Sequence, residues 1–468
     1  MSYGRRIIYT DATVITSENV ADEVRKAMTV HDINRLEIER LWEYYRGKTK
    51  VQTKTKEIRE TINWKVPENR AYEVTSFYKG YIFGEPIQYV RREKADTGDA
   101  DDALAADINA LNGYMVDAGK AACDNTIGEW LLIAGTAYRL TLPNYTWTRD
   151  GDEAPFCIYA LDPRNTFIVY SSGFDKRPVM AVHYVEREHG ERVFGVYTEY
   201  SYFEFTEFGE VVETPMALGA IPVVEYPADN ARLGVFEIVT DLIDAIDMLQ
   251  SNRMDDVVQS VNSFLAILGG QLDEATYNKL EEWKTLCLPE GVDAKYISPT
   301  LSQTDVQTLK DDLYQAILTI CGVPNRNGGS STSDTGQAVI FRDGYVLAEA
   351  RAKSVETVFK EAEKPFLRLA LRILRDTEGT SLRLTDIETH FTRRNYENLA
   401  AKSQVLIAML NNPNIHPELA FSSSGMFVDP ESAYLQSMAW KDEQEKKEAK
   451  RLADAGASTL PGVQSTPG

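Results

Sequence analysis

The chain has few of the residues on which most catalytic and metal sites are built. It holds five histidines and four cysteines in 468 residues. No two histidines stand four apart, and no HExxH, CxxC or GxSxG sequence occurs. Gly47-Lys48-Thr49 matches the end of a phosphate-binding loop, but Trp42 stands where that loop needs its first glycine. These absences predict a protein that is not an enzyme and needs no cofactor and no metal.

Positive charge and long apolar runs are also scarce. Lys and Arg number 50 against 71 Asp and Glu, which gives a formal net charge of −21. Such acidity argues against a tight nucleic-acid binder, because those proteins gain affinity by neutralising phosphates. It is compatible with a protein past which nucleic acid must slide. No stretch has the roughly 20 nearly uncharged apolar residues of a membrane span.

The cysteines and the N-terminal residues bear on where the protein works. The four cysteines are far apart, which is typical of buried thiols in a reducing compartment. The first sixteen residues lack the apolar core of a signal peptide. We therefore expect a protein that is made in the cytoplasm, and that works there or leaves the cell inside an assembled particle.

Two acidic clusters deserve a test as metal or catalytic sites. Asp96, Asp99, Asp101 and Asp102 offer oxygen ligands for a divalent cation, but the glycine and distal glutamate of an EF-hand are missing. We favour a solvated loop there. Glu281-Glu282 beside Trp283 is more typical of the outer face of a helix than of a catalytic carboxylate pair.

The dominant pattern that is present is a stripe of apolar residues from Val235 to Leu268. They recur at steps of three and four, which predicts one amphipathic helix over the whole range. Such a helix would be roughly 50 Å long. Asp229-Asn230 would cap its start and Gly269-Gly270 would end it. We expect its aspartate and glutamine positions to face water.

The segments that follow predict a chain reversal. A short helix at Asp273–Lys284 and a strand at Val292–Ser298 lead to a second apolar stripe, Ser302–Cys321, which would run back beside the first. A polar stretch rich in glycine and serine, 325–337, comes next. A long helix then runs over Ala338–Arg375, and its internal proline would kink it.

The remaining segments predict further helices and a sheet, and so an α+β fold. The first thirty residues resemble an arm, followed by a helix from His31 to Arg46. Residues Asn69–Gly84 and Ala103–Ile133 are predicted to be helical. From Tyr138 to Tyr226 the apolar period is two, which predicts a mostly antiparallel sheet. A helical region after Gly379 and an unanchored C-terminal tail end the chain.

The order of these parts resembles the portal proteins of tailed bacteriophages, especially those of long-tailed phages of Gram-positive hosts. Several short motifs carry the resemblance through their order and spacing. They are Asn69, Lys79-Gly80-Tyr81, Gly84-Glu85-Pro86-Ile87, Gly135-Thr136-Ala137-Tyr138, Leu161-Asp162-Pro163, Phe167-Ile168-Val169-Tyr170, Gly219-Ala220-Ile221-Pro222-Val223-Val224, Asn230, Leu242-Ile243-Asp244-Ala245, Gly322-Val323-Pro324 and Ser333 to Ala338. One departure is Asp334-Thr335-Gly336-Gln337-Ala338, where the family often has a Ser-Gly-x-Ala type of sequence.

The resemblance implies a mostly helical α+β subunit of a ring, with the parts that portal proteins share. These would be an N-terminal arm (1–30), a wing of helices and mostly antiparallel sheet (31–230), two antiparallel stem helices (231–268 and 302–323), a clip (269–301), a tunnel loop (324–337), a kinked wing helix (338–379), a helical crown (380–454) and a disordered tail (455–468).

The resemblance also implies a function. A ring, usually of twelve copies, would stand at one capsid vertex in the virion and admit and release double-stranded DNA. Its partners would be the terminase motor, head-completion adaptors, and the major capsid and scaffolding proteins. No membrane is involved, and assembly would take place in the host cytoplasm.

Two groups of residues are the candidate sites under this reading. The tunnel loop would present to DNA the residues Asn325, Arg326, Asn327, Gly328, Gly329, Ser330, Ser331, Thr332 and Ser333. The clip would bind its partners through Glu281, Glu282, Trp283, Lys284, Lys295 and Tyr296. Arg326 could touch a phosphate or form a salt bridge between subunits, and the sequence leaves both open.

Two other functions compete with a portal. One is a structural collar or scaffold protein without a channel. The other is a metal-dependent nuclease that uses the segment Asp96–Asp102.

Overall fold

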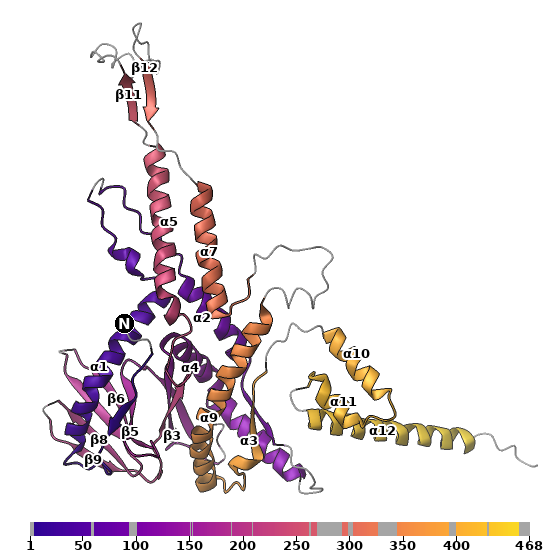
Figure 1. The fold of residues 1–468 in the computed structure, drawn as a ribbon. Coiled ribbons are helices and arrows are strands. Elements are labelled where there is room, and N and C mark those ends of the chain that lie inside the picture. Colours follow the sequence, from indigo (N-terminus) through magenta and orange to yellow (C-terminus); the bar gives the residue numbers. More distant parts are fainter. Residues whose placement is uncertain are drawn as a thin grey trace, which may run out of the picture.

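A computed structural model describes residues 4–457 apart from several short gaps. The gaps are 58–59, 93–100, 150, 152, 189, 208, 262–263, 269–292, 298–302, 326–343, 393–398 and 428–429. The protein is of mixed α/β type and about half helical, in agreement with the α+β prediction (Figure 1). None of the described helices is both long enough and apolar enough to cross a membrane.

The N-terminal residues are part of the body, so the predicted arm is wrong. Strand β1 (Ile8–Thr10) pairs in parallel with β5 (Thr166–Ser171). Helix α1 spans Val20–Tyr45 rather than beginning at His31. Its first turns carry apolar side chains that pack on the sheet, among them the fully buried Val20. Burial of this face holds residues 20–30 in the helix.

Two sheets account for the predicted strands. The larger has the order β1-β5-β6-β7-β8-β9 and the smaller β10-β3-β4, and every pairing except that of β1 with β5 is antiparallel. Their bounds are β3 Thr136–Pro143, β4 Phe156–Leu161, β6 Pro178–Glu186, β7 Arg192–Tyr197, β8 Ser201–Thr206, β9 Val212–Pro215 and β10 Val223–Pro227. The period of two over 138–226 therefore predicted a mostly antiparallel sheet correctly.

Helices α4 (Lys120–Ala134) and α9 (Tyr345–Thr377) pack on the smaller sheet, and α9 has Pro365 inside it. Helices α2 (Arg70–Phe83) and α3 (Asp101–Asp117) pack in turn on α4. Asn69 caps α2, since its side chain accepts a hydrogen bond from the Tyr72 amide at 3.3 Å. Gly119, with φ +69°, separates α3 from α4 and divides the single predicted helical stretch.

The region after α9 is not helical throughout, which corrects the predicted crown boundary at residue 380. A short 3-10 turn (Leu384–Asp386) leads into β13 (Ile387–His390), which pairs with β2 (Gln88–Arg91) of the body. Helices follow only later. They are α10 (Leu399–Leu410), α11 (Pro417–Ser424) and α12 (Pro430–Ala457), which contact one another in sequence. Helix α12 extends three residues beyond the start of the predicted disordered tail.

A cluster of buried charges ties these elements together. Arg139 of β3 lies between Asp124 of α4 and Glu363 of α9, and Lys120 bonds to both carboxylates. Tyr226 also donates a hydrogen bond to Glu363 at 2.7 Å. Burial alone would raise the pKa of Glu363, but the charges of Arg139 and Lys120 hold it at about 2. The two acids and two bases thus neutralise one another inside the core.

Replacing Glu363 by alanine should destabilise the fold by roughly 3–5 kcal/mol, because two buried cations lose their partner. Thermal and denaturant unfolding measure this change. The control is Glu361→Ala on the same helix, where the side chain is 66% exposed. That control should change stability by no more than about 0.5 kcal/mol. Equal effects of the two substitutions would contradict the role given to the buried cluster.

His31 is a second buried titratable group, on the face of α1 that meets the sheet. It is 1% exposed, its ring stacks on Phe167 at 4.3 Å, and its Nε2 lies 3.0 Å from the Arg164 carbonyl oxygen. Burial lowers the pKa of His31 from 6.5 to about 4. The folded protein therefore holds this imidazole neutral at pH values where the unfolded chain protonates it.

This difference predicts a loss of stability in mild acid. As the pH falls from about 6.5 to about 4, the unfolded state takes up a proton that the folded state does not, so His31 should lower the free energy of unfolding by about 3 kcal/mol. The variant His31→Gln should lack this component in unfolding curves taken across that range. The control His416→Gln, at an exposed residue, should keep it. An unchanged pH profile in His31→Gln would refute the assignment.

Candidate functional site

The predicted helix from Val235 to Leu268 consists of three elements. A 3-10 turn (Glu237–Val239) precedes α5 (Thr240–Val261), and Phe264–Leu268 forms β11. Strand β11 pairs antiparallel with β12 (Asp293–Ile297), with Phe264 opposite Ile297. The apolar run in β11 fits the period of a helix or a strand, and the distant partner decides between them. The strand predicted at Val292–Ser298 is confirmed.

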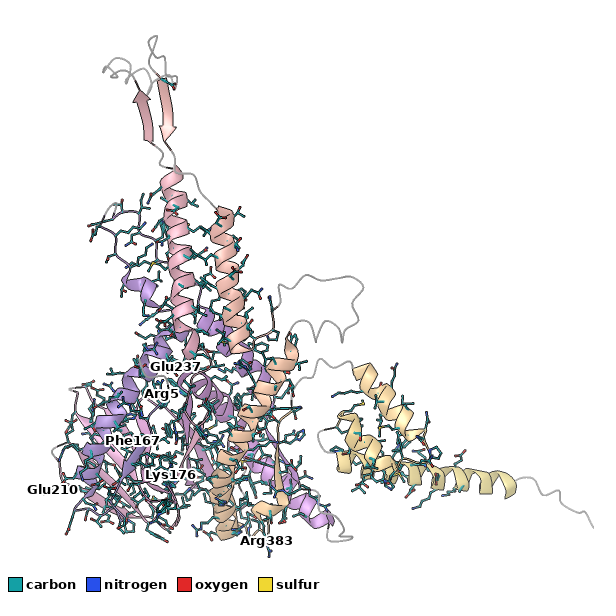
Figure 2. The ribbon with its side chains drawn as sticks, viewed as in Figure 1. Arg5, Phe167, Lys176, Glu210, Glu237 and Arg383 are labelled. Atoms are coloured by element: carbon teal, nitrogen blue, oxygen red, sulfur yellow. The ribbon has the colours of Figure 1, made fainter. Side chains whose placement is uncertain are left out.

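The start of the predicted helix also differs. Asp229 does not cap it, since its Oδ1 accepts from the Leu233 amide at 3.2 Å within an earlier turn. Glu237 is the side chain that fixes the base of α5. It is buried, pairs with Arg5, and accepts from the Gly4 and Gly234 amides at 3.0 Å each (Figure 2). The N-terminal residues are thereby fastened to the base of the projecting helix.

Helix α7 (Gln303–Cys321) returns beside α5, as predicted (Figure 1). Near the far end of the pair, Arg253 donates to the Gln307 side-chain oxygen at 2.8 Å. Closer to the body, Lys310 donates to that of Gln250 at 3.3 Å. At the base, both helices contribute buried isoleucines to the main core. The pair therefore projects from the body as an antiparallel unit that ends in the β11–β12 hairpin.

A second segment, residues 48–68, is called the strap here, and its described residues, 48–57 and 60–68, contact α5 along its length. Three buried side chains of α5 accept hydrogen bonds from its backbone amides. Asp255 accepts from the Trp64 amide at 2.7 Å, Ser251 from that of Val66 at 2.9 Å, and Asp247 from that of Glu68 at 2.8 Å. Four helical residues advance about 6 Å, and two residues of extended chain about 6.6 Å. The two spacings match, so alternate amides meet successive turns.

Lysines of the strap add charge to this contact. Lys54 and Lys56 lie 2.7 and 2.6 Å from the Oδ2 of Asp255. Burial would raise the pKa of Asp255, but the hydrogen bonds from these lysines lower it below 3.8. Asp247 has no such lysine, and burial raises its pKa. The prediction that the aspartates of this helix face water is wrong for both residues.

The structure covers only part of the candidate clip and tunnel-loop sites. Lys295 and Tyr296 lie on β12, opposite Ala266 and Leu265 of β11. Glu281, Glu282, Trp283 and Lys284 fall outside the described residues, as does the short helix predicted at 273–284. Of the tunnel-loop candidates only Asn325 is described, and Arg326 to Ser333 are not.

The candidate metal segment is also covered in part. Asp101 and Asp102 begin α3, whereas Asp96 and Asp99 lie outside the described residues. Within the part of the chain that the structure describes, no three acidic, histidine or cysteine side chains are grouped to hold a metal ion.

The family model described as phage portal protein, SPP1 Gp6-like, matches residues 27–455. The chain belongs to this portal protein family. No protein of curated function matches it in sequence.

Solved structures give more distant matches. One is the neck of a native GTA particle computed with C12 symmetry, at 13% identity over 84% of this chain and 94% of that chain, with a TM-score of 0.46. Another is the neck of an empty GTA particle computed with C6 symmetry, at 13% identity over 76% and 90%, with a TM-score of 0.43.

Sequence reasoning missed the strap as a part of this portal protein's projecting unit. A signal was present, because Asp247, Ser251 and Asp255 stand four apart and form a polar stripe within an apolar pattern. A polar stripe on a helix is usually read as a solvated face. Only the position of residues 64–68, nearly two hundred residues earlier in the chain, shows that this stripe is covered.

Replacing Asp255 by asparagine should release the strap, because the two lysines lose their buried partner. Trypsin should then cleave after Lys54 and Lys56 at least about tenfold faster than in the unmodified protein. The control is Asp256→Asn, at the exposed neighbouring position. Equal cleavage rates in all three proteins would show that the contact does not hold the strap in place.

Proposed function

We propose that the chain forms a ring of twelve copies at one capsid vertex of a phage particle, around a channel for double-stranded DNA. The observation that carries this proposal is the match of the portal family model to residues 27–455. Membership of that family supports a structural rather than a catalytic role. The long-tailed type and the Gram-positive host stay predictions from the sequence motifs.

The projecting helix pair supports assembly through its exposed apolar side chains. On α5, Met248 and Val257 are 38% and 40% exposed, and on α7, Leu309 and Ile320 are 50% and 39% exposed. A single chain leaves these groups in water. Head-to-tail copies around a closed ring would cover them, since such an interface uses two different faces of every subunit. We propose that α5 and α7 are the stem that forms the wall of the channel.

The acidity of the chain supports a conduit rather than a tight DNA binder. Twelve copies, each with a formal charge of −21, offer DNA little of the gain that follows from neutralising phosphates. The tunnel loop, 324–337, is proposed to reach toward DNA with hydrogen-bonding groups and one cation, Arg326.

The other proposed contacts follow the same layout. The hairpin of β11 and β12 lies at the far end of the stem, which suits a clip (269–301) that meets the terminase motor and later the head-completion adaptors. The body would be the wing, facing capsid and scaffolding proteins. The helices α10, α11 and α12 would be the crown inside the head. Assembly is proposed to take place in the host cytoplasm.

Negative-stain imaging of the purified chain tests this function. We expect rings with twelvefold symmetry and a central hole about as wide as duplex DNA. Solid particles would favour a collar or scaffold without a channel, and monomers at every concentration would reject the ring. Divalent-dependent cleavage of DNA by the purified protein would instead support a nuclease.

A further inference from the structure

We propose that neighbouring copies join through the strap of one chain and the outer face of α7 of the next. The partner is a second copy of this chain, placed head to tail. The inference rests on the proposed ring and adds which surfaces meet in it. Three observations carry it: the charge of the strap, the charge of α7, and the matching heights of the two along α5.

The strap presents positive charge and a large aromatic ring away from α5. Residues 48–68 hold six Lys and Arg and three Glu, in a chain that is otherwise strongly acidic. Lys54 and Lys56 face Asp255, as described above. The side chains of Lys48 and Lys65 are exposed, and that of Trp64 is 48% exposed. Tryptophan is among the residues that most often contribute binding energy at protein interfaces.

The outer face of α7 has the opposite charge. Asp305 and Asp312 are exposed on it, about one turn to either side of Leu309. The single basic residue of this helix, Lys310, does not lie on this face, because it bonds Gln250 of α5 and pairs with Glu68 at the end of the strap. Leu309 lies among the aspartates and is 50% exposed. The face thus offers negative charge together with an apolar contact for an aromatic ring.

The two surfaces flank α5 and lie at the same heights along it (Figures 1 and 2). Arg253 of α5 bonds Gln307 of α7, and Gln250 of α5 bonds Lys310 of α7. The helices are antiparallel, so a residue of α5 is level with the residue of α7 whose number brings the sum of the two to 560. Asp255, which holds the amide of Trp64, is therefore level with Asp305. Rotation about an axis parallel to the helices preserves height, and so brings Trp64 and Lys65 of one copy against the Asp305–Leu309 turn of the next.

The same relation holds nearer the body. Thr49 donates to Asp247 at 2.5 Å, and Asp247 is level with Leu313, so Lys48 lies near the level of the neighbouring Asp312 on α7. Two contacts of opposite charge thus coincide at two heights. Like-charged chains repel one another, and a ring of acidic copies needs such local attraction where its subunits touch.

Paired charge reversals test the proposal. One variant carries Lys48→Glu and Lys65→Glu, and the other carries Asp305→Lys and Asp312→Lys. In each variant alone, charges of the same sign face each other across the interface. The protein concentration at which half of the chains are assembled should therefore rise at least about tenfold. An equimolar mixture should assemble again when the two variants alternate. The reversed strap then meets the reversed α7, the unchanged strap meets the unchanged α7, and the charges are opposite at every interface. Native mass spectrometry reports both the ring and its composition.

A matched control reverses two exposed lysines elsewhere. Lys441→Glu with Lys446→Glu on α12 changes the net charge equally and should assemble like the unmodified chain. A salt titration needs no variant: rings of the unmodified chain should dissociate more readily at about 1 M salt than at about 0.1 M, because screening weakens partly exposed pairs.

The outcomes separate the two proposals. Rings of the unmodified chain together with normal assembly of either reversed variant, or a mixture that stays unassembled, would overturn this interface and leave the ring standing. Assembly that is insensitive to salt would also overturn it. Absence of any ring from the unmodified chain would remove the proposed function, and this interface with it.

Discussion

The match in pitch between α5 and the strap is the constraint on which the projecting part of the molecule depends. A helix that projects from the body exposes several of its sides to water unless other segments pack on them. Two different segments pack on α5. One side meets α7 through buried isoleucines at the base and side-chain hydrogen bonds farther out. On another side the buried Asp247, Ser251 and Asp255 meet alternate amides of an extended segment. The base is fixed by Glu237, which holds the N-terminal residues. The position of the terminal hairpin follows from these contacts.

The body uses buried charge in a similar way. The cluster around Arg139 and Glu363 joins α4, β3 and α9, and the cluster at Asp255 joins α5 to the strap. Buried ion pairs add little net stability compared with apolar packing, because both partners lose water. They do raise the free energy of any other arrangement in which one buried charge lacks its partner. Both clusters therefore specify how elements distant in sequence are placed.

Much of the fold could be predicted from local patterns, and the failures have physical causes. The return helix and the antiparallel sheet follow from hydrophobic periodicity, which is a local property. The segment Phe264–Leu268 could not be assigned, because its apolar run suits either state and only Asp293–Ile297 decides it. Family membership was also predictable, from the order of weak motifs. The strap was not, since its partner residues look like a solvated stripe until residues 64–68 are placed on them.

Amide hydrogen exchange at Trp64, Val66 and Glu68 tests the central claim most directly. These amides belong to an extended segment and are held by side chains of α5 rather than by a neighbouring strand. If the strap is docked as a unit, all three should exchange together, at least about a hundredfold more slowly than in an unstructured chain. Exchange of these amides at the rate of an unstructured chain would contradict the account.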